Sequence, residues 1–241
     1  MIRALLVAAI LAPAAANAEQ RPARYLAIGD SYTIGESVSP AERWPNALVR
    51  ALRADGVAID DATVFARTGW TTDELLAKLV VAEYGKPVTL TETEVAAKLA
   101  PPYDLVSLLI GVNNQYRGRD VANFEAEFAR VLERAIGYAG GEARRVIVLS
   151  IPDWGSTPFA REKGRDAATI GAEIDSYNAA KRRICEAHGI AFIDITGFTR
   201  EALGDPSVLA DDGLHPSGKD YARWAEKALP FAREALQHAR D

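Results

Sequence analysis

The residues of this chain that could perform chemistry are a serine near its start and an acid and a histidine near its end. Ser31 stands in RYLAIGDSYTIGES, directly after an apolar run, and Asp212 and His215 stand in ADDGLHPSG. A serine becomes a nucleophile when a histidine accepts its proton, and a carboxylate on the other ring nitrogen orients that histidine. Asp212 and His215 are three residues apart, so one turn, stiffened by Pro216, lets them interact. These residue types predict nucleophilic catalysis.

The same chemistry needs hydrogen-bond donors for the negative charge that develops on the substrate oxygen. Gly69 follows a second apolar run and Asn113 follows a third. In a parallel sheet, the loops after the strands meet at one edge, because the carboxyl ends of all strands lie there. The sequence therefore places a nucleophile, a base, an orienting acid and candidate donors at one edge of a sheet.

Other sites fit the loop after the first apolar run less well. A phosphate-binding loop would have four residues between its glycines and then a lysine, whereas five separate Gly29 from Gly35 and Glu36 follows. No Gly-x-Gly-x-x-Gly fingerprint of dinucleotide-binding proteins follows any predicted strand. A phosphatase of the Asp-x-Asp type would need a carboxylate where Tyr32 stands, two residues after Asp30.

Metal-dependent hydrolysis is also disfavoured. The chain has three histidines, His188, His215 and His238, and two of them fall in helical patterns away from the loops. Cys185 is the only cysteine, so no internal disulfide forms, and its helical pattern predicts a core position. We expect neither a metal nor another cofactor.

Alternating strands and helices are predicted to position these loops. The alternation indicates a parallel sheet with helices on both faces in a doubly wound topology, within a single domain over residues 19–241. The predicted strands are residues 25–28, 63–66, 105–110, 146–149 and 192–195. The predicted helices are residues 45–54, a segment through 75–79, a segment from 124 to about 139, a segment through 170–184 that Gly189 ends, and residues 219–239.

Two local features concern helix ends and interruptions. Ser39 and Glu42 have the spacing of a capping box, but a helix starting there would hold Pro45 in its interior, so Thr71 and Glu74 are the better candidates. Pro230 is predicted to kink or divide the last helix.

The ordered motifs resemble those of the SGNH, or GDSL-type, serine hydrolases. They are GDSY at 29–32, Gly69, GVNN at 111–114 and DGLH at 212–215. Each motif alone is weak, but together they follow the family order over nearly the whole chain after residue 18. The resemblance implies a three-layer α/β/α sandwich with a five-stranded parallel sheet of the flavodoxin-like type.

The resemblance also implies a role for each motif residue. Ser31 would be the nucleophile, His215 the base and Asp212 the acid that orients it. The backbone N–H groups of Ser31 and Gly69, with the side chain of Asn113, would form the oxyanion hole.

Two positions depart from the family pattern, and several residues are candidates for substrate binding. Tyr32 replaces the leucine of the GDSL motif, and Asn114 replaces the usual aspartate of its block. Neither supplies a catalytic atom, although both could shape the pocket. Aromatic residues on the same edge would either stack on a sugar or pack the loops, and these alternatives stay open. The substrate-binding candidates are Tyr32, Trp70, Asn114, Tyr116 and Trp154, with Phe159 beside them.

The first 18 residues have the pattern of a secretory signal peptide. Arg3 is followed by an apolar run over residues 4–16 and an A-x-A cleavage site over residues 16–18. The run is shorter than the ~20 apolar residues of a membrane span, and no cysteine follows Ala18 to accept a lipid. These features predict export to the periplasm or outside the cell, without a membrane anchor. Cleavage would leave 27 basic and 33 acidic residues, so a nucleic-acid partner is not expected.

These patterns together favour an exported serine hydrolase that acts on carboxylic esters with short or acetyl acyl groups, carried by small molecules or glycans. A deacetylase of acetylated carbohydrates is the alternative within this class. A carbohydrate-binding protein on the same fold is the alternative outside it, although a protein that only binds has no need of the Ser31, Asp212 and His215 set.

Overall fold

The computed structural model describes residues 21–83, 99–201 and 204–239. Five strands in these residues form one parallel sheet in the order β2-β1-β3-β4-β5. The three central strands are buried along their whole length, as expected of strands covered by helices on both faces. The strands are β1 (Tyr25–Gly29), β2 (Thr63–Ala66), β3 (Leu105–Leu109), β4 (Val146–Leu149) and β5 (Ala191–Ile193).

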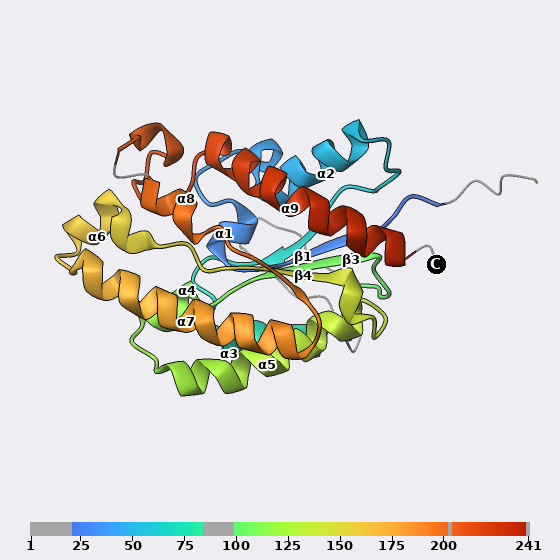
Figure 1. Cartoon of the computed structure of the whole chain (residues 1–241), viewed down its shortest axis with the longest axis horizontal. Helices are drawn as coiled ribbons and strands as arrows, with labels where there is room; N and C mark the ends of the chain where they lie inside the picture. The colour runs from blue at the N-terminus through green and yellow to red at the C-terminus, as the bar shows by residue number, and fades with distance from the viewer. Residues whose placement is uncertain (1–20, 84–98, 202–203, 240–241) are drawn as a thin grey trace, which may run out of the picture.

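Helices cover both faces of the sheet, which makes the predicted three-layer α/β/α sandwich (Figure 1). The helices α2 (Trp44–Ala54) and α9 (Gly218–His238) pack against each other on one face. The helices α3 (Thr72–Glu83), α5 (Val121–Tyr138) and α7 (Ala167–Ala187) lie in the opposite layer. The doubly wound, flavodoxin-like prediction is therefore confirmed.

The strand order places a topological switch point between β1 and β3. From β1 the chain crosses to β2 on one side, whereas from β3 it crosses to β4 on the other. Ligands of doubly wound proteins bind at such a switch point, beyond the carboxyl ends of the strands. The segments that follow β1 and β3, which hold Ser31 and Asn113, lie side by side there, because the two strands are neighbours in the sheet.

Several elements that the periodicity did not predict are short. One helical turn contains too few residues to show a 3.6-residue pattern, and these turns stand where loops were expected. Ser31, for example, is the first residue of a helix rather than a loop residue. The short helices are α1 (Ser31–Ile34), α4 (Val112–Tyr116), α6 (Pro158–Glu162) and α8 (Thr196–Glu201), with the 3₁₀ turns η1 (Pro40–Glu42), η2 (Ala143–Arg145), η3 (Trp154–Ser156) and η4 (Pro206–Val208).

The prediction that Ser39 and Glu42 do not form a capping box was wrong. The Glu42 carboxylate accepts hydrogen bonds from both the backbone N–H and the hydroxyl of Ser39, 3.1 and 2.6 Å away. This contact belongs to η1, which ends before α2 begins, so Pro45 still lies in the first turn of its own helix. At α3, the Glu74 carboxylate accepts from the Thr71 N–H at 3.0 Å, as predicted.

Two other predictions concern Pro230 and the end of the last strand. The helix α9 runs through Pro230 without being divided. Pro230 lies on the exposed side of α9 and so does Glu226, whose carbonyl loses its helical partner to the proline, so water can satisfy that carbonyl. The last strand, β5, ends two residues earlier than predicted, because the Asp194 carboxylate accepts from the Thr196 N–H and begins α8.

Cys185 is buried in the core, as predicted. None of the helices within the described residues has the length and apolarity to cross a bilayer. The predicted signal peptide, residues 1–18, lies outside the described residues.

Candidate active site

The structure joins Ser31, His215 and Asp212 in one continuous line of hydrogen bonds. The Ser31 Oγ lies 2.9 Å from the His215 Nε2, and the His215 Nδ1 lies 2.6 Å from the Asp212 Oδ2. Ser31 and His215 are buried, whereas the Asp212 side chain is 30 % exposed. The serine comes from the end of β1 and the other two residues from the turn before α9.

The turn that carries the histidine is organised by Asp212 itself. Its Oδ1 accepts from the backbone N–H groups of Leu214 and His215, both at 2.9 Å, which leaves Oδ2 for the imidazole. Partial burial would raise the pKa of Asp212, but hydrogen bonds from His215, Ser37 and the backbone hold that pKa far below its ordinary value. Asp212 is therefore a carboxylate at neutral pH.

Ser31 is placed by a close approach of backbone segments. A Cβ at Gly29 would lie 2.2 Å from the Thr33 Oγ1 and 2.3 Å from the Leu109 carbonyl oxygen, so only glycine fits there. Asp30 then caps α1, since its Oδ1 accepts from the Tyr32 N–H at 3.1 Å. The strand must end at Gly29 for the chain to turn and present Ser31.

Three hydrogen-bond donors lie around the Ser31 hydroxyl. Gly69 has a φ of +85°, and the Arg117 Nη2 donates to its carbonyl oxygen at 2.6 Å. The Asn113 Nδ2 donates to the Trp70 carbonyl oxygen at 2.9 Å, which fixes the amide and leaves its second N–H free for a ligand. The N–H groups of Ser31 and Gly69 donate to no acceptor in the described chain. These donors can serve one developing oxyanion.

A small cavity of about 190 Å³ opens beside these groups. Tyr116, Trp154 and Phe159 form one wall, with ring centroids 5.3 to 6.3 Å apart. Tyr32, Val112 and Leu214 complete the apolar lining around Ser31 and His215.

Tyr32 lies where the resemblance implies a leucine. Its ring is buried against the His215 imidazole, with centroids 5.2 Å apart, and also borders Trp224. The structure thus places Tyr32 at the cavity, as an apolar support for the histidine.

The interpretation of Trp70 and Asn114 as substrate-binding residues does not fit the structure. Neither lines the cavity. The Trp70 ring is buried beside Phe65, 5.7 Å away between centroids, and its carbonyl orients Asn113. Asn114 is fully buried, where its Oδ1 accepts from the Thr72 N–H at 3.0 Å and its Nδ2 donates to the Thr72 hydroxyl at 2.7 Å. Asn114 joins α4 to the start of α3, and Trp70 joins α4 to the segment just before α3.

The GDSL-like lipase/acylhydrolase family matches residues 27–223, which include every motif residue described above. The chain belongs to this family. It is therefore a carboxylic ester hydrolase with the SGNH fold, and the resemblance found in the sequence is confirmed. The comparison with curated protein sequences found no match.

Solved structures of GDSL-type proteins share the fold at low sequence identity. TesA is 20 % identical with a TM-score of 0.60, and the alignment covers 88 % of this chain and 99 % of that one. Axe2, an acetylxylan esterase from Geobacillus stearothermophilus, is 20 % identical with a TM-score of 0.62, covering 88 % and 94 %. A lipase/acylhydrolase from Enterococcus faecalis is 22 % identical with a TM-score of 0.57, covering 86 % and 94 %.

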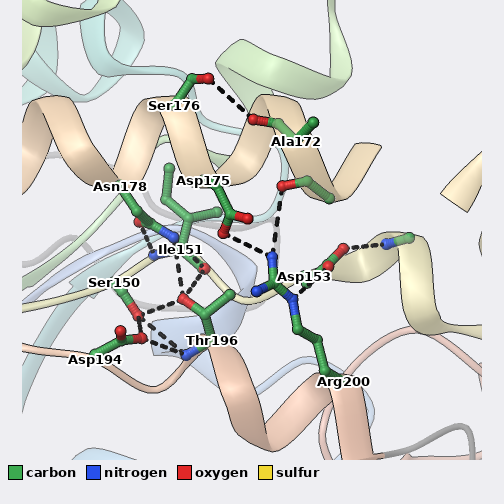
Figure 2. Close-up of polar contacts among 12 residues, drawn as sticks. Ser150, Ile151, Asp153, Ala172, Asp175, Ser176, Asn178, Asp194, Thr196 and Arg200 are labelled. Carbon is green, nitrogen blue, oxygen red and sulfur yellow. Dashed lines mark hydrogen bonds and ion pairs between the residues drawn. The ribbon is translucent and has the colours of Figure 1, made fainter. Parts of the chain in front are cut away.

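In this GDSL-type hydrolase, the segment after β4 is anchored by the polar contacts that Figure 2 shows. The Asn178 side chain bonds both the N–H and the carbonyl of Ile151, at 2.7 and 3.0 Å. The Asp153 carboxylate accepts from the Arg200 Nε at 2.8 Å, and the Arg200 Nη2 donates to Asp175 at 2.7 Å. These contacts fix the backbone that leads into Trp154 of the aromatic cavity wall.

Sequence reasoning missed Gln115, which steadies that wall. Its Oε1 accepts from the Trp154 Nε1 at 2.7 Å, and its Nε2 donates to Glu173 at 2.5 Å. The residue directly follows the GVNN motif, but no spacing rule connects it to a tryptophan 39 positions later.

The sequence analysis also did not predict two buried ionisable groups behind Ser31. Lys181 is fully buried, where its Nζ donates to the carbonyl oxygens of Ile110 and Leu149 at the ends of β3 and β4, and burial lowers its pKa to about 8. Burial raises the pKa of Asp30 to about 7, and its Oδ2 has no hydrogen-bond partner among the described residues. The sequence did contain one indication of the buried lysine: Lys181 follows Tyr177 by four residues, so it falls within the apolar stripe of α7.

Proposed function

We propose that this GDSL-type hydrolase cleaves carboxylic esters through an acyl-enzyme on Ser31. His215 accepts the proton of Ser31 at Nε2 while the Oγ attacks the ester carbonyl carbon. The observation that supports this best is the unbroken contact from Ser31 through His215 to Asp212, with separations of 2.9 and 2.6 Å.

The substrate oxygen becomes negative in this step, and the proposed donors are the N–H groups of Ser31 and Gly69 and the Asn113 amide. The protonated His215 then gives its proton to the leaving alcohol as the C–O bond breaks. In the second half, water attacks the acyl carbon, His215 accepts the water proton, and the proton returns to the Ser31 Oγ as the acid leaves. Asp212 stabilises the imidazolium in both halves.

The size of the cavity supports a short acyl group. At about 190 Å³ it is smaller than the ~300–1,000 Å³ of sites for drug-sized ligands. Its aromatic wall is braced by hydrogen bonds, as at Trp154, so the cavity is not easily widened. Acetyl and other short-chain esters are therefore the proposed substrates.

Acetylated carbohydrates are the second candidate substrates, and one observation favours them. Tyr116 lies at the cavity with 40 % of its surface exposed, so its ring can stack on a sugar. The structural neighbour Axe2 is an acetylxylan esterase, which makes acetylated xylo-oligosaccharides a reasonable test. The assembled Ser31, His215 and Asp212 set argues against a protein that only binds carbohydrate.

We also propose that the protein is exported to the periplasm or outside the cell. The charge, apolar run and A-x-A site within residues 1–18 support a cleaved signal peptide, so the mature chain would begin at Glu19. N-terminal sequencing of the protein from the extracytoplasmic fraction tests this, and a chain that still begins at Met1 would contradict it.

Hydrolysis by the purified mature protein tests the proposed reaction. p-Nitrophenyl esters from acetate to dodecanoate are compared with acetylated xylo-oligosaccharides, each with and without a chelator. We expect the highest kcat/KM for the shortest esters, no effect of the chelator, and no activity in Ser31→Ala. A preference for the longest chains, or full activity in Ser31→Ala, would contradict the proposal.

A further inference from the structure

Ser37 has an unusual backbone conformation close to the catalytic residues. It lies beyond Gly35, the residue that ends α1, and its φ is +64°. Among the described residues it is the one position with a side chain that has a positive φ. Residues with a Cβ rarely adopt this left-handed conformation, and at functional sites it is kept where surrounding contacts require it.

The contact that Ser37 makes is with the catalytic acid. Its Oγ donates to the Asp212 Oδ2 at 2.6 Å, and the same oxygen lies 2.6 Å from the His215 Nδ1. The other carboxylate oxygen is occupied by two backbone N–H groups. Ser37 and the imidazole therefore share one oxygen, and together the donors fix the carboxylate in a single orientation.

Little else explains the presence of this serine. Its side chain is exposed and belongs to no part of the hydrophobic core. Its neighbour Glu36 accepts a hydrogen bond from Thr68, the residue before the proposed donor Gly69. The turn at residues 36–37 therefore connects the end of α1 both to the turn that holds Asp212 and to the loop after β2.

We propose that Ser37 is a positioning residue that holds the Asp212 carboxylate in line with His215. This inference rests on the proposed function of Ser31, His215 and Asp212. Without the hydroxyl, the partly exposed carboxylate would lose one donor to Oδ2 and could rotate or accept from water instead. Proton transfer between Ser31 and His215 would then begin from a less ordered arrangement.

Ser37→Ala should lower kcat about tenfold, a magnitude typical of removing one hydrogen bond to a charged group. KM should stay within about twofold, since the hydroxyl contacts no part of the cavity. The acid limb of the pH profile of kcat/KM should move to higher pH, because an Oδ2 relieved of one donor attracts the His215 Nδ1 proton more strongly. A structural defect alone would not move that limb.

Two further variants separate the hydroxyl from the backbone conformation. Ser37→Gly removes the same hydroxyl, and glycine adopts a positive φ without steric strain. This variant should therefore lose as much activity as Ser37→Ala. Ser39→Ala is the matched control. Ser39 is exposed, lies two residues away and also donates to a carboxylate at 2.6 Å, that of Glu42, which does not touch His215. It should behave as the unmodified protein.

An NMR measurement tests the role of Ser37 without any substrate. The proton between the His215 Nδ1 and Asp212 should give a downfield NMR resonance, which we expect to shift in Ser37→Ala and Ser37→Gly but not in Ser39→Ala. An unmodified protein that hydrolyses none of the esters would contradict the proposed function, and the resonance would still decide the role of Ser37. If the resonance and the acid limb stay unchanged in both Ser37 variants, whether or not kcat falls, the inference is overturned.

Discussion

The exchange of Asp212 for asparagine should reverse the tautomer of His215. In the structure, the Asp212 Oδ1 accepts from two backbone N–H groups at 2.9 Å, so the amide oxygen of an asparagine would keep that position. Its NH₂ must then face His215 and donate to Nδ1. The ring proton is moved to Nε2, where it points at the Ser31 Oγ and prevents His215 from accepting the serine proton.

The magnitude follows from losing both the base and the charge that stabilises the imidazolium. The same substitution costs about 10⁴ in kcat in other serine hydrolases, or about 5.5 kcal/mol in the activation free energy. We expect a similar fall for Asp212→Asn with p-nitrophenyl acetate, with KM nearly unchanged. Initial rates under saturating substrate measure it, with thermal unfolding to show that the fold is retained.

Asp211→Asn is the matched control for this prediction. It makes the same chemical change one position earlier, at an exposed residue that does not line the cavity. Its kcat should stay within about twofold of the unmodified protein. If both variants show equally mild effects, the reasoning is refuted, and His215 would have to be oriented by some other group.

Three further predictions concern the donors, the buried acid and the cavity. Asn113→Ala should lower kcat by about 10²–10³ with little change in KM, since it removes one donor to the oxyanion, and an effect on KM alone would contradict this role. Asp30→Asn keeps the oxygen that caps α1. The pKa of Asp30 is raised to about 7 in the folded chain, so the folded state binds a proton between about pH 4 and 7 that the unfolded chain releases, and stability falls over that window. Denaturant titrations should show the variant gaining about 2 kcal/mol on the unmodified protein between pH 5 and 7, and a constant difference would contradict this. Phe159→Ala removes part of the cavity wall and should raise the kcat/KM ratio of octanoate to acetate esters about tenfold, whereas an unchanged ratio would show that the wall does not select chain length.

The long elements of the fold were predictable because their hydrophobic patterns are strong. The run at 105–110 is apolar almost throughout, as a central strand covered on both faces requires. The single-turn helices were not predictable, since four or five residues show no period. The end of β5 was misplaced because it depends on a side-chain contact, that of Asp194 with the Thr196 N–H.

The meeting of Ser31, His215 and Asp212 was predictable from motif order, because each motif follows a strand and parallel strands bring their carboxyl ends together. The directions in which neighbouring side chains point were not predictable from the sequence. Asn114 stands beside Asn113 in the sequence, yet the α4 helix turns one amide toward the cavity and the other into the core. Ser37 meets Asp212 across 175 positions, a contact that no local pattern contains.

The measurement that tests the central claim most directly is covalent labelling of the mature protein with a fluorophosphonate, which traps a serine activated by a histidine. Fragmentation of the tryptic peptide 25–43 should place one adduct on Ser31, with no adduct in Ser31→Ala and much slower labelling in His215→Ala. An adduct on another residue, or undiminished labelling of Ser31→Ala, would contradict the claim that Ser31 is the nucleophile.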